Sequence, residues 1–68
     1  MITFERAMAD GITAGQLWNV AVSNDEMISA EMAQKWPDAS RVARLTAQRD
    51  NLALVAKRVA LTLRSAAA

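Results

Sequence analysis

The spacing of apolar residues predicts a first long helix over residues 14–36. Within this segment the apolar residues recur at the helical intervals of three, four and seven, and they are Leu17, Trp18, Ala21, Val22, Ile28, Met32 and Trp36. Side chains at these intervals share one broad face of an α-helix. Val20 and Met27, seven residues apart, lie to one side of that face. We expect the face to be core and Trp18 to be buried in it.

A second long helix is predicted over residues 40–63, and it carries apolar residues on two sides. Its main seam alternates steps of three and four residues along Val42, Leu45, Arg49, Leu52, Ala56, Val59 and Leu63, as in helices that pair. A second apolar stripe lies about 180° away around the helix, and it comprises Ala43, Ala47, Leu54 and Leu61. One partner helix cannot cover both sides. Residues 64–68 are expected to fray.

Threonine and glycine mark where the first long helix begins. Thr13 and Gln16 match the capping box, in which each side chain satisfies a backbone N–H of the first turn. Before them, Thr3 is a candidate cap for a short helix over residues 3–9 that ends ahead of Gly11. The alternative is one continuous helix from Thr3, with Gly11 inside it. We favour the break.

Pro37 predicts the turn between the two long helices. Its ring cannot continue a helical hydrogen-bond ladder, and it biases the preceding Trp36 away from the helical region. Either Asp38 or Ser40 is then the N-cap of the second helix. Because a short turn joins helices of similar length, the fold class is all-α, an antiparallel helical hairpin forming one domain over residues 1–68. Pairing outward from the turn sets Ile28 beside Arg49.

Composition indicates that the hairpin needs a partner. Hydrophobic residues make up 53% of only 68 residues, and the chain contains neither cysteine nor histidine for a disulfide or a structural zinc site. A chain this short draws little stability from its core. We therefore expect self-association, with two hairpins forming a four-helix homodimer.

Two charged residues interrupt the predicted apolar faces. Asp25 falls within the face of the first helix, and Arg49 falls within the seam of the second. The antiparallel arrangement brings them within reach of each other, so we expect a buried or half-buried ion pair. Losing one partner of such a pair leaves an uncompensated charge. A structural role in setting helix register is favoured over a binding role.

The remaining candidate binding residues are those that the hairpin leaves outside. We assign them to a dimer or target interface, and they are Val20, Met27, Trp36, Ala43, Ala47, Leu54, Arg58 and Leu61. Tryptophan and arginine are enriched at interface hot spots, and methionine adapts to varied partners. The sequence pattern does not show which of these residues contact a second copy of the chain and which contact a target.

The residue types present argue against catalysis, membrane insertion and nucleic-acid binding. No serine, threonine or carboxylate stands in a catalytic frame, and no glycine-rich phosphate loop occurs, so we expect neither enzymatic activity nor a cofactor or metal. Charged or amide side chains interrupt every apolar run, and the first residues do not form a signal peptide, which predicts a cytoplasmic protein. The net charge of +1 gives little attraction to nucleic acid.

Four features of the chain carry a resemblance: its short length, the Thr13 cap, the Trp36-Pro37-Asp38 turn and a second helix rich in alanine, leucine and arginine. In these features the chain resembles the small helical proteins that temperate phages express early against their bacterial host. Within that group the chain is similar to the anti-quorum-sensing proteins of Pseudomonas phages. The resemblance implies a helical dimer that inhibits a LuxR-type quorum-sensing regulator, the type IV pilus assembly ATPase, or both. A structural coiled-coil component and a small DNA-binding regulator are the alternative functions.

Overall fold

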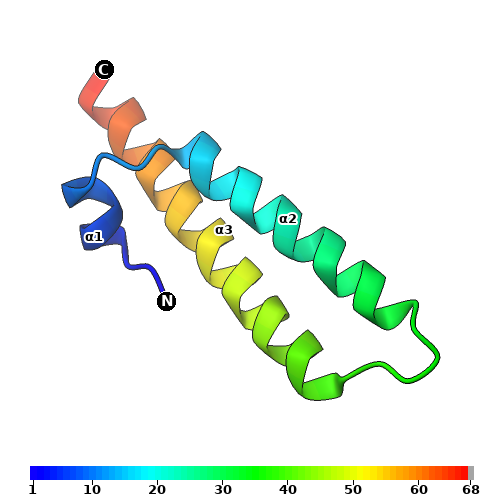
Figure 1. Ribbon diagram of the computed structural model, residues 1–68. Helices are drawn as coiled ribbons and strands as arrows, with labels where there is room; N and C mark the ends of the chain where they lie inside the picture. Colours follow the sequence, from blue (N-terminus) through cyan, green and yellow to red (C-terminus); the bar gives the residue numbers. More distant parts are fainter. Residues whose placement is uncertain (68) are drawn as a thin grey trace.

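The computed structural model describes residues 1–67, which fold into three helices. They are α1 (Phe4–Ala9), α2 (Ala14–Met32) and α3 (Ala39–Ala67). The two long helices lie side by side in opposite directions, and α1 packs beside α3 near the open end of this hairpin (Figure 1). The molecule is elongated, with extents of 50 × 16 × 14 Å. The predicted all-α antiparallel hairpin is confirmed.

Both predicted N-terminal caps are present. The Thr3 hydroxyl accepts a hydrogen bond from the Arg6 backbone N–H at 3.1 Å. Thr13 and Gln16 form the complete capping box, with distances of 3.1 and 2.9 Å for its two hydrogen bonds. Between them Gly11 adopts a φ of 67°, which side chains of L-residues disfavour. The break between α1 and α2 is therefore confirmed, and the continuous helix is wrong.

The first long helix ends earlier than predicted. Its last residue is Met32, and Ala33 is its C-cap, so Trp36 lies in the connection and is 82% exposed. The proline that follows Trp36 excludes it from the helical region, and the chain leaves the helix one turn before that constraint. At the far side Asp38 is the N-cap, because its carboxylate accepts the backbone N–H groups of Ser40 and Arg41 at 3.0 and 3.2 Å.

The second long helix extends further than predicted. It remains helical through Ala67 rather than fraying after residue 63. Alanine has the highest helix propensity, which favours continuation of the ladder through the alanine-rich end of the chain. Residue 68, which was also expected to fray, lies outside the described residues.

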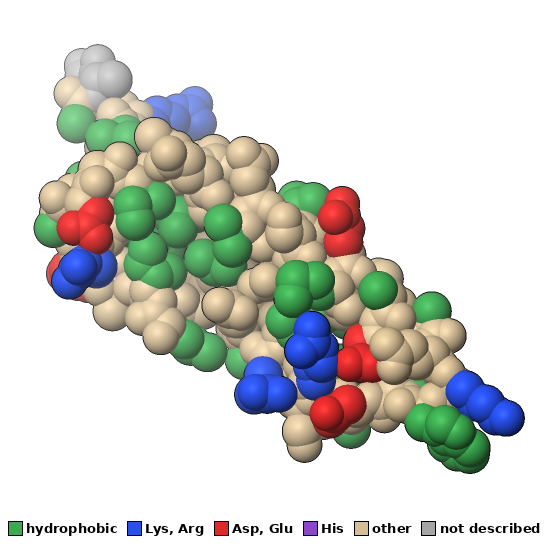
Figure 2. Space-filling view, in the orientation of Figure 1, with side chains coloured by type: hydrophobic (Ala, Val, Ile, Leu, Met, Phe, Trp, Pro, Cys, Tyr) green, Lys and Arg blue, Asp and Glu red, His purple; other side chains and the backbone are tan. Residues whose placement is uncertain are grey.

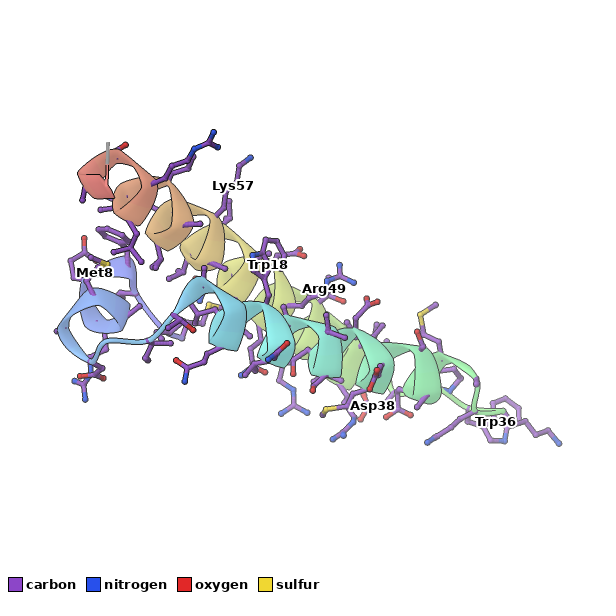
Figure 3. The ribbon with its side chains drawn as sticks, turned by 90° about the horizontal axis from the view of Figure 1, so that it is seen from above. Met8, Trp18, Trp36, Asp38, Arg49 and Lys57 are labelled. Atoms are coloured by element: carbon purple, nitrogen blue, oxygen red, sulfur yellow. The ribbon has the colours of Figure 1, made fainter. Side chains whose placement is uncertain are left out.

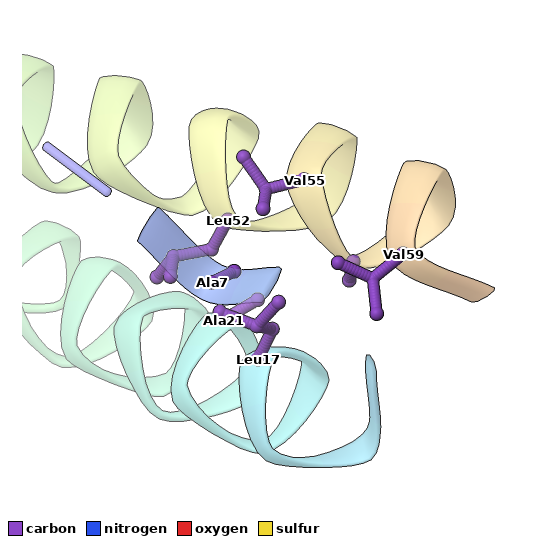
Figure 4. Packing of buried hydrophobic residues seen from close by; sticks show 7 residues of the cluster. Ala7, Leu17, Ala21, Leu52, Val55 and Val59 are labelled. Carbon is purple, nitrogen blue, oxygen red and sulfur yellow. The ribbon is translucent and has the colours of Figure 1, made fainter. Parts of the chain in front are cut away.

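The core lies where all three helices meet. Its buried cluster comprises Ala7, Leu17, Ala21, Leu52, Val55, Ala56 and Val59 (Figure 4). The short helix α1 is held against α3 by the Asn51 side-chain amide, which donates to the Ile2 carbonyl at 2.9 Å. The Arg58 guanidinium also lies 4.2 Å from the centre of the Phe4 ring. Both contacts fix α1 over one side of the hairpin.

The buried face of α2 is rotated from the predicted one. Its buried residues are spaced by four and three, and they are Leu17, Ala21, Asn24, Ile28 and Glu31. Trp18 is 45% exposed, so the prediction that it is core is wrong, and Val22 and Met32 are 55% and 62% exposed. The prediction followed apolar residues alone, and it therefore missed a seam that includes two polar positions.

Two ion pairs join the long helices across their interface. Arg49 contacts Asp25 at 2.6 Å, which is the pair expected from the antiparallel arrangement. Nearer the turn, Arg41 contacts Glu31 at 3.3 Å.

We expect Thr13→Ala to lower the free energy of unfolding by about 1 kcal/mol, because it removes one half of the capping box at the start of α2. Thermal unfolding followed by circular dichroism measures the change. Thr62→Ala, at an exposed position in the last two turns of α3, is the matched control and should not lower the midpoint, because alanine has the higher helix propensity. Equal effects of the two substitutions would contradict the role of the cap.

Candidate protein interaction surface

An ion-pair cluster joins the two long helices at one edge of their interface. The Arg49 guanidinium donates to Asp25 at 2.6 Å and to Asp50 at 3.2 Å. These hydrogen bonds raise the pKa of Arg49 above its ordinary value, so the side chain stays charged at any physiological pH. The Arg49 and Asp25 side chains are 33% and 60% exposed. The predicted pair therefore forms, but at the rim of the seam and not inside it.

Two polar side chains that sequence reasoning missed lie inside the seam. Glu31 is buried and meets the Arg41 guanidinium at 3.3 Å. Asn24 is only 6% exposed, and its amide nitrogen has no hydrogen-bond partner in the described part of the chain. The four-three spacing that continues through both positions was the signal available in the sequence. Buried polar groups of this kind specify register at a cost in stability.

One exposed apolar surface lies beside the ion-pair cluster. Here a shallow hollow is lined by Trp18, Ala21, Val22, Asp25, Arg49 and Ala53. The labelled side chains of Trp18 and Arg49 are neighbours on the same side of the hairpin, and Lys57 lies further along that side (Figure 3). The hollow is lined by an aromatic ring, by alanine and valine side chains, and by one acid and one base. None of the predicted interface residues lines it.

A second apolar surface lies between the segments that flank α1 and the helix α2. A groove there is lined by Ile2, Ile12, Gln16, Leu17, Asn19, Val20 and Leu52. Val20 is 47% exposed, and Met27, two turns further along α2, is 41% exposed. In the space-filling view, hydrophobic side chains gather at the end of the molecule that carries α1, and charged side chains gather towards the middle (Figure 2). The groove places Val20 in an apolar setting.

The outer side of α3 forms a third apolar surface. Leu54 and Leu61 are 70% and 54% exposed, and Ala43 and Ala47 are also exposed. Arg58 differs from these four residues because its guanidinium lies over the Phe4 ring of α1. The predicted stripe is thus solvent-accessible along α3, while Arg58 already has an intramolecular partner.

The tip of the hairpin carries the most exposed tryptophan. Trp36 projects from the end of the molecule (Figure 3), and the Lys35 ammonium lies 5.8 Å from the centre of its ring. The eight predicted interface residues therefore do not form one surface. They divide among the α2 side, the outer side of α3 and the tip.

Within the described part of the chain, the candidate site consists of exposed surfaces. Across residues 1–67, no three side chains among histidine, cysteine, aspartate and glutamate are grouped so that they could hold a metal ion. In the same part of the chain, no helix has the length and apolar character needed to cross a bilayer. What the arrangement supplies is apolar side chains with charged neighbours, the composition of protein contact surfaces.

The fold and these surfaces define a small three-helix hairpin protein with apolar side chains exposed on several sides. In comparisons with known proteins, no family model, curated protein or solved structure matches the chain.

We expect Asn24→Leu to raise the free energy of unfolding by about 1 kcal/mol, because it replaces a buried amide, which has no hydrogen-bond partner among the described residues, with an apolar side chain of similar size. Denaturant unfolding measures the change. Ser23→Leu, at the neighbouring exposed position, is the control and should produce no such gain. A loss of stability in Asn24→Leu would show that the amide contributes to the native packing.

We expect Asp25→Ala and Arg49→Ala each to lower the midpoint of thermal unfolding by less than Leu52→Ala does. The ion pair lies at a solvated rim, whereas Leu52 is buried in the core. The double variant should lose less than the sum of the two single losses, since the two side chains contact each other. Strict additivity would argue against any coupling between them.

Proposed function

We propose that this protein is a non-enzymatic protein–protein inhibitor that a phage produces in the cytoplasm of its bacterial host. Its proposed targets are a LuxR-type quorum-sensing regulator, the type IV pilus assembly ATPase, or both. It acts as a homodimer that occupies a functional face of the target, and no bond is made or broken. One inhibitor dimer therefore blocks at most a fixed number of target molecules.

The observation that carries this proposal is the amount of large apolar side chain in contact with solvent. Trp36, Leu54 and Met32 are 82%, 70% and 62% exposed on a chain of 68 residues. Extended apolar surface on a small protein marks sites of association. The three surfaces described above allow self-association and target binding to use different sides of one hairpin.

The charges of α3 support a protein target over nucleic acid. Arg41 and Arg49 are paired with carboxylates of α2, and Arg58 lies over an aromatic ring. Affinity for duplex DNA depends on basic side chains that neutralise phosphates. Arginines already held in intramolecular contacts are less available to neutralise phosphates.

The direct experiment adds the purified protein to a purified LuxR-type regulator bound to its promoter DNA, and separately to a purified pilus assembly ATPase. We expect release of the DNA or loss of ATP hydrolysis, complete near stoichiometric amounts of the added protein. Retained DNA binding and unchanged hydrolysis at micromolar excess would together contradict the proposed targets. Direct binding of the protein to promoter DNA that weakens steeply with salt would favour a DNA-binding role.

We expect Trp36→Ala to raise the Kd for the target about thirtyfold, as truncation of a tryptophan hot spot does. The helical circular dichroism spectrum should not change, because the ring is 82% exposed in the free protein. Gln34→Ala, also exposed in the same connection, is the matched control and should bind normally. Unchanged affinity in Trp36→Ala would remove the tip of the hairpin from the target surface.

A further inference from the structure

A second seam runs along the outer side of α3, opposite the one that packs on α2. Its positions alternate by four and three residues, and they are Ala43, Ala47, Asp50, Leu54, Lys57 and Leu61. This repeat is the pattern by which one helix packs lengthwise along another. Every one of these residues is exposed in the single chain. The seam therefore has the periodicity of a helix interface, but no helix of its own chain covers it.

The length of α3 suits such an interface. It has 29 residues, against 19 in α2, which corresponds to roughly 43 Å of straight helix. Leu54, near its middle, is 70% exposed, although it is one of the largest apolar side chains of the helix. The inward side of α3 is already used by α2 and α1, so only the outer side remains for another helix.

The outer seam is complementary to itself when two copies run in opposite directions. Placing Ala43 opposite the partner's Leu61 also sets Ala47 opposite the partner's Lys57 and Asp50 opposite the partner's Leu54. Each layer then joins a short side chain to a long one, which lets the two helices approach closely and interdigitate. The two-fold axis of the dimer generates a second copy of each of these three pairings, so the interface contains six pairings.

The charges in the seam select the direction of this pairing. In the antiparallel arrangement Lys57 extends over the partner's Ala47, and its ammonium lies within one helical turn of the partner's Asp50. A parallel arrangement in register places Asp50 beside Asp50 and Lys57 beside Lys57, which is repulsive. Arg58, at the flank of the seam, is directed towards the Phe4 ring of α1. The acid and the base of the seam are thus complementary to those of a reversed copy, while Asp50 also accepts hydrogen bonds from Arg49 of its own chain.

We propose that the outer side of α3 is the homodimer interface, in which a second copy of this chain packs antiparallel with Ala43 beside the partner's Leu61. This assignment deepens the proposed function, because it reserves the tip and the α2 side for the target. The contacts form between two identical surfaces, so the interface is isologous and closes at two copies.

Paired cysteines test the proposed register without any target protein. The chain has no cysteine of its own, so the double variant Ala43→Cys with Leu61→Cys carries the only thiols. Within one chain the two positions are 18 residues apart on a helix, or about 27 Å, and a disulfide requires Cα atoms closer than about 7 Å. Under mild oxidation we expect covalent dimers from the double variant. The single variant Ala43→Cys should remain uncrosslinked.

A double variant that stays monomeric on non-reducing electrophoresis would overturn the proposal, as would equally rapid crosslinking of the single variant, which indicates a parallel pairing. Light scattering of the unmodified chain should give twice the monomer mass at about 100 µM, within the range of weak self-association. A monomer mass at that concentration would also overturn it.

Leu54→Glu provides the complementary measurement. A carboxylate opposite the partner's Asp50 should raise the dimer dissociation constant about tenfold or more, while the helical spectrum is kept because position 54 is 70% exposed. Met32→Glu, which is 62% exposed on α2, is the matched control and should remain dimeric. Dimerisation that is lost in the control and kept in Leu54→Glu would place the interface on α2 and overturn the assignment. Target binding is measured separately, so failure of the inhibitor proposal does not imply failure of this interface.

Discussion

The seam between α2 and α3 is the constraint on which the rest of the molecule depends. Leu17 and Ala21 from one helix and Leu52 and Ala56 from the other are all buried there. A helix of six residues such as α1 does not persist alone in water, so its helical state requires the surface that this seam presents. The choice of which side chains face inward on the two long helices also decides which ones remain outside. The exposed surfaces are therefore a consequence of the seam.

The polar residues within that seam limit how stable one hairpin can be. Asn24 is buried with an amide nitrogen that lacks a hydrogen-bond partner among residues 1–67, and Glu31 is buried against a single arginine. Each replaces an apolar side chain that would add stability, and each makes a shifted pairing of the helices unfavourable. A short chain that uses polar residues for specificity has little stability in reserve. Association through a further surface is a natural compensation.

Local signals in the sequence were sufficient for the fold class and for the starts of the helices. Thr13 with Gln16 located the start of α2, because a capping box acts through hydrogen bonds within one turn. The predicted end of α2 was wrong, because it depends on where the chain leaves the helix before Pro37 and not on the proline alone. The exposed state of Leu54 and Leu61 was predictable from angular position. The burial of Asn24 was missed, since hydrophobicity carried the prediction and the four-three spacing through a polar residue was not followed.

The docking of α1 affects binding at the groove beside α2. Ile2 and Ile12 flank α1 and supply one wall of the groove that contains Val20, so this wall exists only while α1 is docked. Undocking exposes Ala7 and the side of α3 beneath it, which are buried in the closed form. The groove and the docked segment are thus linked thermodynamically. A molecule that fills the groove slows amide hydrogen exchange throughout residues 4–9, although it need not touch most of them.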